Sequence, residues 1–452
     1  MAYRTLTALE AHATRDRLQE MQTIPQPIID DNAANSNSAC PSPPDGGYGW
    51  AIVAACFALN AFTWGVTASF GVYLSEYITS AKFPGTTPLE FGLVGGLNFS
   101  CAMLLAPLTT YLTRKCGLHA IVLLGSLIQC IGYISASFAS QTWHLYLSQG
   151  ILVGVGIGLI IVPSTAILSQ WFSAKRSITN GISSAGSGVG GAAFTWGTAK
   201  MLQDPGLAWA LRTTGLITLA ANICAALLLR DRNKHINPTQ LAFDIKLLHS
   251  RKVLLLVLWA FFSMFGYITL LFSLSDFALS IGLSRQQATD VVGLLNIGTA
   301  IGRPVIGIAS DRVSRVGVAG FLTFLCGLIC FALWLPATSS GLLTFFSILC
   351  GAILGVFWMT IGPLCAEIAP LKHMQSLLSI SWTAIIIPTA CAEVIALQLR
   401  ELPSPRVYLY PQLFAGFSYL IASGFIFGLW IALRQQQAER HDDQHIIRGN
   451  YS

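Results

Sequence analysis

The chain is short of charged residues. Asp, Glu, Lys and Arg together make up 10% of its 452 residues, whereas a soluble globular domain usually carries about 25%. Hydrophobic residues account for 54% of the sequence, and the mean hydropathy is +0.62. This composition excludes an ordinary soluble domain and indicates a membrane protein. The basic residues behind the formal net charge of +6 are spread over short loops, so we expect no nucleic-acid partner.

Motifs of enzymes and metal sites are also missing. The sequence has no HExxH, no GxSxG, no P-loop lysine and no paired-carboxylate motif, and such patterns mark common catalytic sites. Its eleven cysteines include no CxxC pair, which argues against a zinc or disulfide framework. Residues 186–191 match GxGxxG, but they lie in a run of small residues within an apolar segment, so we interpret them as helix packing. We therefore expect no enzyme activity, no cofactor and no metal.

The N-terminal region lacks the apolar stretch of a signal peptide. Residues 1–47 are polar, with scattered charges and a segment rich in Asn, Ser and Pro. Such a composition cannot bury a core. We expect a disordered cytoplasmic tail over 1–47.

Long apolar stretches dominate the rest of the chain. A membrane-spanning helix needs about 20 mostly apolar residues, and the sequence predicts twelve of them. The polar segment 231–250 divides these spans into two groups of six. We expect an all-α membrane protein with one six-helix bundle over 48–230, a cytoplasmic linker over 231–250, a second bundle over 251–433 and a cytoplasmic tail over 434–452. The predicted spans are 48–76, 89–112, 119–140, 143–170, 177–200, 208–229, 252–280, 286–309, 316–336, 340–366, 376–399 and 408–433.

The distribution of basic residues supports this topology. With both termini in the cytoplasm, 19 of the 26 Lys and Arg residues fall on the cytoplasmic side and six on the outside. The remaining one, Arg303, lies inside a span. Cytoplasmic loops of membrane proteins carry an excess of Lys and Arg, so the sequence predicts an even number of spans with cytoplasmic termini.

Arg303 is the most informative single residue. A cation at bilayer depth costs about 2.5 kcal/mol or more, and such residues usually face a wet cavity or a partner. Asn296 and Thr299 share its helical face, at spacings of three and four residues. Three interpretations stay open: Arg303 binds an anionic substrate, pairs with the internal acid Glu393, or extends to the membrane interface.

Further polar and aromatic residues fall on the inward faces of predicted spans. Asn60 and Trp64 lie in the first span and Trp382 in the eleventh. We predict that they shape a substrate pocket together with Arg303, Asn296 and Thr299. Glu393 is the one acid that we consider for proton coupling, because the other acids lie near span ends.

A possible conformational latch follows the eighth span. Asp311 could accept hydrogen bonds from the N-terminus of a neighbouring helix, with Arg312 or Arg315 as its ion partner. Such a contact would hold one conformation and release in another. The alternative is a plain solvated loop.

Several motifs carry a resemblance to a known family. Residues 45–50, Asp-Gly-Gly-Tyr-Gly-Trp, resemble the signature of the monocarboxylate transporter family of the major facilitator superfamily. The stretch 171–186 resembles the family's loop between helices four and five, and Gly302-Arg303-Pro304 with Gly307 and Asp311-Arg312 resembles its helix eight and the following loop. Gly362-Pro363 and Glu367 resemble the branch found in filamentous fungi.

The resemblance implies two six-helix bundles, a central cavity and alternating access, with Arg303 receiving a substrate carboxylate. Three departures limit it. Ala68 stands where proton-linked members have a lysine, Thr299 stands where they have an aspartate, and residues 113–117 lack the acid of the superfamily loop. The first two losses argue against lactate-type proton symport. The third indicates that the latch is complete only in the C-terminal half.

These observations predict a monomeric secondary transporter of a small organic molecule, anionic and bearing a carboxylate. The missing proton-relay residues favour export of a secondary metabolite over uptake of a monocarboxylate nutrient. A non-transporting membrane sensor is the alternative of another class. We expect a multi-pass protein surrounded by lipid in the cell membrane, with a vacuolar or other internal membrane as the alternative.

Overall fold

The computed structural model describes residues 43–79, 83, 85–232, 244–401 and 406–449. Within these ranges all regular secondary structure is helical. The first half contains α2 (Gly49–Asn60), η2 (Ala61–Gly65), α3 (Val66–Ala68), α4 (Phe70–Thr79), α5 (Pro88–Leu104), α6 (Ala106–Cys116), α7 (Leu118–Ala136), α8 (Thr142–Leu145), η3 (Tyr146–Leu152), α9 (Val153–Trp171), α10 (Arg176–Gln203) and α11 (Leu207–Leu228).

The second half contains η4 (Ile245–His249), α13 (Arg251–Ser280), α14 (Arg285–Arg312), α15 (Arg315–Ile329), η5 (Cys330–Trp334), α16 (Ser340–Leu354), α17 (Val356–Ile368), α18 (Leu371–Ala384), α19 (Ile386–Gln398) and α20 (Leu409–Gly449). Every predicted span coincides with one of these helices or with two to four consecutive ones. Among the described residues, ten helices are long and apolar enough to cross a membrane, and the pair α5–α6, bent by 48°, makes an eleventh. The all-helical membrane fold is confirmed.

The remaining predicted span is α10, which is long enough to cross but less apolar than the others. Its 28 residues correspond to about 42 Å of helix. Gly and Ser residues lower its hydropathy, yet most of its side chains are buried. Because it is packed between α2 and α14, α10 does not need the apolar surface that a lipid-facing helix requires.

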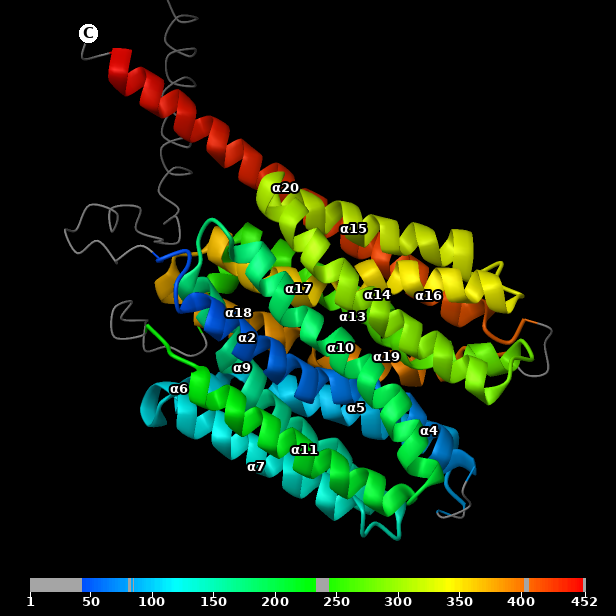
Figure 1. The fold of residues 1–452 in the computed structure, drawn as a ribbon. Helices are drawn as coiled ribbons and strands as arrows, with labels where there is room; N and C mark the ends of the chain where they lie inside the picture. Colours follow the sequence, from blue (N-terminus) through cyan, green and yellow to red (C-terminus); the bar gives the residue numbers. More distant parts are fainter. Residues whose placement is uncertain (1–42, 80–82, 84, 233–243, 402–405, 450–452) are drawn as a thin grey trace, which may run out of the picture.

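The helices form two groups that follow the order of the chain. Figure 1 shows α2 to α11 on one side of the molecule and α13 to α20 on the other, with α10 and α14 in the middle. In the first group α7 packs against α9 and α11, and in the second α20 packs against α13 and α15. Large apolar side chains such as Phe138, Leu227 and Phe321 are exposed on the outer faces, as expected for a surface covered by lipid.

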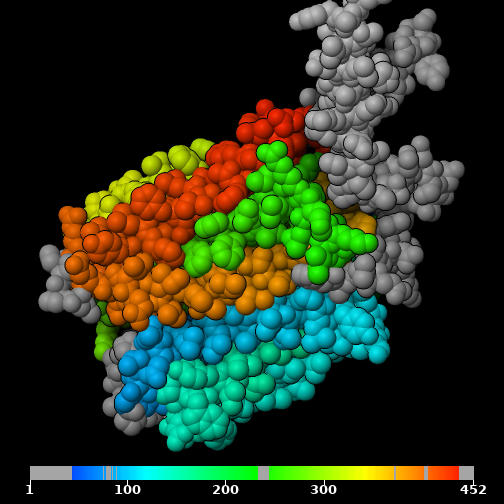
Figure 2. Space-filling model, turned by 180° about the vertical axis from the view of Figure 1, so that it is seen from behind, coloured from blue at the N-terminus to red at the C-terminus, as the bar shows by residue number. Residues whose placement is uncertain are grey.

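The two groups meet along two seams. At the first, α10 crosses α14 at very short range: a Cβ atom on Gly181 would lie 2.5 Å from Arg303 O, and one on Gly188 would lie 2.5 Å from Ala300 N. The small residues of 186–191 therefore serve helix packing, as predicted. At the second seam α5 packs against α19 and α6 against α18, and Figure 2 shows these blue and orange segments side by side.

The predicted tail and linker are only partly covered by the described residues. Residues 1–42 and 233–243 lie outside them, so the prediction of a disordered tail over 1–47 is tested only at its end. There Asp45 N donates to Trp171 O at 3.0 Å, which fixes the chain before α2. The final helix differs from the predicted span 408–433, because α20 continues to Gly449.

Candidate functional site

A central cavity lies between the two groups of helices. All six predicted substrate-binding residues line it: Arg303, Asn296, Thr299, Asn60, Trp64 and Trp382. About 40 Å³ of the cavity is open to the centres of water-sized molecules, which is room for a few waters. Organic ligands usually occupy pockets of about 300–1,000 Å³. In this structure the cavity is therefore too small for a typical organic ligand.

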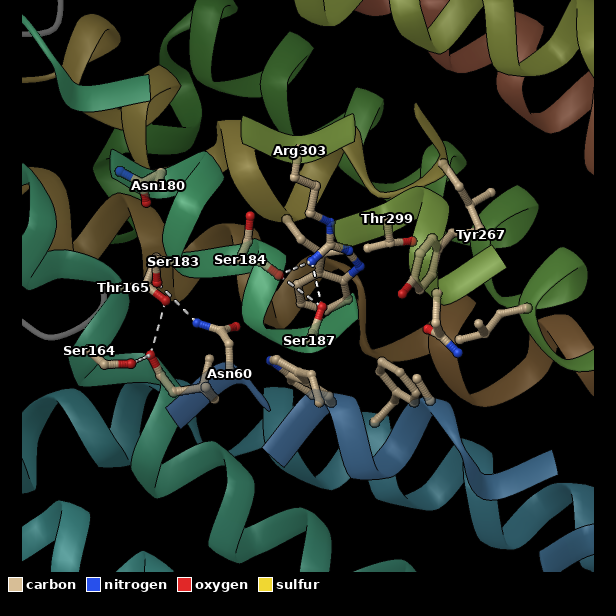
Figure 3. A pocket seen from close by; sticks show the side chains of 18 of the residues that line it. Asn60, Ser164, Thr165, Asn180, Ser183, Ser184, Ser187, Tyr267, Thr299 and Arg303 are labelled. Carbon is tan, nitrogen blue, oxygen red and sulfur yellow. Dashed lines mark hydrogen bonds between the residues drawn. The ribbon is translucent and has the colours of Figure 1, made fainter. Parts of the chain in front are cut away.

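Arg303 extends from α14 across the seam to α10. Its side chain is 5% exposed, and Nη1 donates to Ser184 O and Ser187 Oγ, both at 2.7 Å. Figure 3 shows the guanidinium pointing at these two serines, with Tyr267 beside it. Its Nε has no hydrogen-bond partner within the described residues. The charge is thus held by neutral groups.

The two competing interpretations of Arg303 do not fit this geometry. Glu393 lies elsewhere, where both carboxylate oxygens accept from Ser273 Oγ at 3.3 and 3.1 Å. In the described part of the chain no acid forms an ion pair with Arg303. Nor does the guanidinium reach the membrane interface, because it is buried against the cavity. A desolvated cation without a counter-charge is unfavourable, so a bound anion would stabilise the site.

Asn296 and Thr299 line the cavity, but they donate hydrogen bonds to backbone carbonyls, Asn296 within α14 and Thr299 to α16. Asn296 Nδ2 donates to Val292 O at 3.1 Å, and the amide lies so close to Gly191 that a Cβ atom there would be 2.5 Å from Asn296 Oδ1. Thr299 Oγ1 donates to Gly351 O at 3.0 Å. Asn296 therefore supports the packing of α10 on α14, and Thr299 supports the packing of α16 on α14, more directly than they present polar groups to a ligand.

Aromatic side chains form one wall of the cavity. Trp64 stacks on Phe99 with ring centroids 4.8 Å apart and lies 5.2 Å from Trp358. Trp358 stacks on Trp382 at 5.6 Å, and Tyr267 lies 5.9 Å from Trp358. Because Trp64 and Phe99 belong to the first half and Trp358 and Trp382 to the second, the wall spans both halves.

Neutral polar groups lie at another part of the cavity. Asn60 Nδ2 donates to Ser183 Oγ at 3.2 Å and to Cys56 O at 2.9 Å. Figure 3 places Thr165 and Asn180 near this pair. These groups add hydrogen-bonding capacity without charge.

Sequence reasoning missed four important lining residues: Ser184, Ser187, Tyr267 and Trp358. Ser187 belongs to the run 186–191 that we attributed to packing alone, and Ser184 lies just before that run in α10. Their spacing of three residues puts them on one helical face, which was the available signal. Nothing in the sequence distinguishes Tyr267 or Trp358 from aromatic residues of the helix core.

The predicted latch contact is present between α14 and α10. Asp311 Oδ1 accepts from Ser177 N at 3.0 Å, and Oδ2 accepts from Ile178 N at 2.9 Å. Arg315 Nη2 lies 3.2 Å from Asp311 Oδ1 and also donates to Ser173 O at 2.9 Å. Arg312 is exposed and points to none of these groups in the described contacts. Of the two candidate partners, Arg315 forms the ion pair.

Asp45, from the signature motif, binds the loop between α9 and α10, which Arg315 also contacts. Its Oδ1 accepts from Ser173 N at 2.7 Å and from Ala174 N at 2.9 Å. Ser173 is therefore bound through its N–H by Asp45 and through its carbonyl by Arg315. This connection ties the entry of α2 to the contact between α10 and α14.

The second seam has a different cytoplasmic contact. Arg114 Nε and Nη2 donate to Gln375 Oε1 at 3.1 and 3.0 Å. This pair joins α6 to α18 but contains no acid. The sequence predicts this, because residues 113–117 lack the acid of the superfamily loop.

The opposite end of the molecule is more open. A pocket of about 210 Å³ lies there between α4, α10, α13 and α14, lined by residues such as Gln203 and Gln286. The basic-residue distribution assigns this end to the outside. The structure thus combines a closely contacted end at Asp311, a small central cavity and a wider pocket at the opposite end.

Comparisons with known proteins agree with this architecture. The chain matches the Major Facilitator Superfamily over residues 53–391. The human protein of "Crystal structure of the human organic anion transporter MFSD10 (TETRAN)" superposes with a TM-score of 0.62 at 14% sequence identity, over 85% of this chain and 100% of that chain. At this identity the likeness concerns the fold alone.

Three curated relatives are similar over most of their length. "Probable transporter MCH2" of Saccharomyces cerevisiae is 31% identical over 417 residues, covering 89% of this chain and 88% of that protein. The "Fujikurins efflux protein" of Gibberella fujikuroi is 25% identical, covering 89% and 87%. Human "Monocarboxylate transporter 12" is 27% identical, covering 84% and 80%. The chain therefore belongs to the major facilitator superfamily, as a monocarboxylate porter-like membrane transporter and not an enzyme.

Proposed function

We propose that this protein moves a small carboxylate-bearing organic molecule across the membrane by alternating access, and that Arg303 binds the carboxylate. One observation carries the proposal: a buried guanidinium faces the central cavity with only neutral partners. A carboxylate would supply the missing charge and charge-assisted hydrogen bonds. The unpartnered Nε of Arg303 leaves a donor available for it.

The two seams provide the moving parts of such a cycle. The Asp311–Arg315 contact closes the cytoplasmic end of α10 and α14, and the external pocket lies at the other end of the same helices. Opening the cytoplasmic end while closing the external one would change the aqueous side to which Arg303 is accessible. Rigid-body rocking of two bundles around a fixed site is the usual scheme for such carriers.

Export of a metabolite is the direction that we propose. The similarity to the "Fujikurins efflux protein" supports it. So do Ala68 and Thr299, at the positions where proton-linked relatives carry a lysine and an aspartate. The second candidate is uptake of a monocarboxylate, which the similarity to "Monocarboxylate transporter 12" favours. We propose the cell membrane as its site; a fluorescent fusion imaged with membrane markers tests this assignment.

Transport by the purified protein in proteoliposomes tests the role of Arg303. The probes are radiolabelled aliphatic and aromatic monocarboxylates, each paired with its primary alcohol. We expect exchange of at least one acid and of none of the alcohols. Arg303→Gln should abolish that exchange, whereas Arg251→Gln, at an exposed position at the start of α13, should leave it unchanged. Full exchange by Arg303→Gln at equal protein content would overturn the carboxylate assignment.

Direction is tested separately in cells. A deletion strain and its parent are compared for organic acids in medium and cells. Export predicts that an acid accumulates in the deleted cells and falls in the medium. The opposite pattern, with an acid left in the medium, supports the uptake candidate.

A further inference from the structure

The aromatic wall of the central cavity contains indole N–H donors without partners, which a carboxylate site alone does not need. We infer that the substrate carries, besides its carboxylate, a planar conjugated ring with hydrogen-bond acceptors that pair with the indole N–H groups of Trp64, Trp358 and Trp382. This inference rests on the proposed function, because it specifies the part of the same substrate that lies away from Arg303.

Hydrogen-bond donors without partners are concentrated at the central cavity. Thirteen buried side-chain nitrogen and oxygen atoms in the described residues have no hydrogen-bond partner. Four of them line this single cavity: Arg303 Nε and the Nε1 atoms of Trp64, Trp358 and Trp382. All four are donors. Since buried polar groups in folded proteins are nearly always paired, this concentration points to acceptors supplied by a ligand.

Burial excludes solvent as the general explanation. Trp64 is 8% exposed and Trp382 is 1% exposed, and the cavity in this state has room for only a few waters. A buried indole usually finds a partner for its N–H. Here the indoles of Trp64 and Trp382 lack one along the same wall, and the half-buried indole of Trp358 has only the neighbouring Tyr267 hydroxyl. A ligand that offered only an aliphatic body would leave them unpaired.

The faces of these rings specify the shape of the ligand. Trp64 and Phe99 stack at 4.8 Å, and Trp358 and Trp382 stack at 5.6 Å. Between the two pairs, Trp64 and Trp358 approach to 5.2 Å with their planes tilted by 44°. This contact joins η2 of the first half to α17 of the second. A planar ring could separate these two indoles and stack on both, because aromatic pairs prefer offset or edge-to-face contacts at such distances.

Charge selects against other ligands. A cationic ring would lie close to the Arg303 guanidinium in a site without any lining acid. A small aliphatic acid would satisfy Arg303 but not the indole donors. A conjugated acid with ring carbonyl or ether oxygens satisfies both sets of donors at once.

Four commercially available probes separate these features. Coumarin-3-carboxylate has a planar ring, acceptor oxygens and a carboxylate. Naphthalene-2-carboxylate lacks the acceptors, cyclohexanecarboxylate lacks the planar ring, and coumarin lacks the carboxylate. Binding to the purified protein in nanodiscs is measured by calorimetry. We expect coumarin-3-carboxylate to bind about five- to tenfold more tightly than naphthalene-2-carboxylate, as one or two added hydrogen bonds would give.

Conservative variants identify the donors. Trp64→Phe, Trp358→Phe and Trp382→Phe keep an aromatic face and remove the N–H. We expect each to reduce the advantage of the coumarin acid over the naphthalene acid, with little change in the affinity for the naphthalene acid. Trp334→Phe is the matched control, because Trp334 Nε1 is also buried without a partner but lies outside the cavity.

The outcomes distinguish this inference from the proposed function. Equal affinity for the two planar acids, an advantage that survives all three Trp→Phe variants, or no binding of coumarin-3-carboxylate overturns the inference about the ring. Each of these results leaves the carboxylate site intact if Arg303→Gln still weakens the binding of cyclohexanecarboxylate. Tight binding of coumarin itself, unaffected by Arg303→Gln, would instead overturn the proposed function.

Discussion

Arg303 and Glu393 are a buried base and a buried acid in the spanning helices, and they lie at different seams. Arg303 faces the cavity between α10 and α14. Glu393 lies in α19, where it contacts Ser273 of α13 and packs beside Gly92 of α5. The charged groups near Glu393 are Asp276 and Arg400, which pair with each other at 2.6 Å. Glu393 itself has a hydroxyl partner and no cation in the described contacts.

We predict that Glu393 carries a proton during the transport cycle. Burying an unpaired carboxylate is costly, and a bound proton removes that cost when the seam closes. Glu393→Gln mimics the protonated acid, so we expect it to retain substrate exchange while net transport no longer responds to pH. The measurement is exchange and net flux of the same labelled acid in proteoliposomes at several pH values.

Ser273→Ala supplies the control for this prediction. It removes the hydroxyl that donates to Glu393 but keeps the acid, so the pH response should shift in position without disappearing. A Glu393→Gln protein whose net transport follows pH as the wild type does would exclude Glu393 as the proton site.

The outer neighbours of Glu393 form a cluster that belongs to the external end. Tyr408 donates to Asp276, which also pairs with Arg400. Burial and the neighbouring Asp276 carboxylate raise the pKa of Tyr408, so its hydroxyl remains a donor at physiological pH. The cluster joins the loop before α20 to α13.

Much of the candidate site could be predicted from single residues. A lone cation in an apolar segment is costly enough to single out Arg303, and the spacing of polar residues on its helix indicated Asn296 and Thr299. The sequence could not show that these two side chains turn toward Gly191 and Gly351. That depends on which helix packs against α14, which is a property of the whole bundle. The same reason hid Ser184 and Ser187.

At the scale of helices, the α10–α14 seam depends on the absence of side chains. The glycines of α10 let two backbones approach where any Cβ would collide, as at Gly181 and Gly188. Small residues have this role in membrane helix packing generally. Because Arg303 reaches Ser184 and Ser187 across this seam, close packing and the substrate site are coupled.

Gly188→Ala should therefore destabilise the protein and weaken the Arg303 site together. The added methyl group would meet Ala300 N at 2.5 Å, and overpacking of this kind costs about 1–3 kcal/mol. The matched control is Gly197→Ala in the same helix, where nothing lies within 4 Å of the added atom. Thermal unfolding of both purified variants is the measurement. An equal melting temperature for the two would show that the seam relaxes freely.

The contact between Asp311 and the start of α10 also joins two helices, and its contribution to stability can be stated. A carboxylate at a helix N-terminus contributes about 0.3–1 kcal/mol, and up to about 2 kcal/mol when partly buried. The pair with Arg315, in which the side chains of Arg315 and Asp311 are 20% and 11% exposed, adds about 0–1 kcal/mol. We expect Asp311→Asn to shift the population toward an open cytoplasmic end, by about five- to thirtyfold for a loss of 1–2 kcal/mol.

Spin labels on α10 and α14 at the cytoplasmic end measure this shift as a distance distribution. Arg312→Gln is the matched control, since Arg312 takes no part in the contact. Asp311→Asn with the wild-type distribution would show that the contact is not a latch. The Ser177–Asp311 hydrogen bonds would then be only a local helix cap.

For the whole molecule, hydropathy and composition were sufficient to predict an all-helical membrane fold. Among the described residues, ten of the twelve predicted spans are long and apolar enough to cross a membrane, or eleven with the bent α5–α6 pair. Hydropathy and composition could not predict which helices form the seams, because small residues occur in several spans and pairing depends on shape. They also missed the bend between α5 and α6 and the continuation of α20 to Gly449. The bend lies at Leu105, two residues before Pro107, whereas Pro163 and Pro304 lie inside helices that stay continuous. A proline in a span therefore does not by itself predict where the helix bends.

The cytoplasmic contacts at the two seams differ in charge. The α10–α14 contact contains an ion pair and a capped helix, whereas the α6–α18 contact is an Arg114–Gln375 hydrogen bond without an acid. Gln375→Glu would convert it into an ion pair at the same place. We expect the closed cytoplasmic end to become more populated and turnover to fall several-fold, with substrate binding from the outside preserved.

This outcome follows only if opening at the cytoplasmic end limits transport, because extra stability of the closed state then raises the barrier to leaving it. Turnover is measured in proteoliposomes and binding in nanodiscs on the same preparation. Adding Arg114→Gln to Gln375→Glu removes the new ion pair and should restore turnover. If the single variant transports at the wild-type rate while the spin-label distances confirm a more closed end, the slow step of the cycle lies at the external end instead.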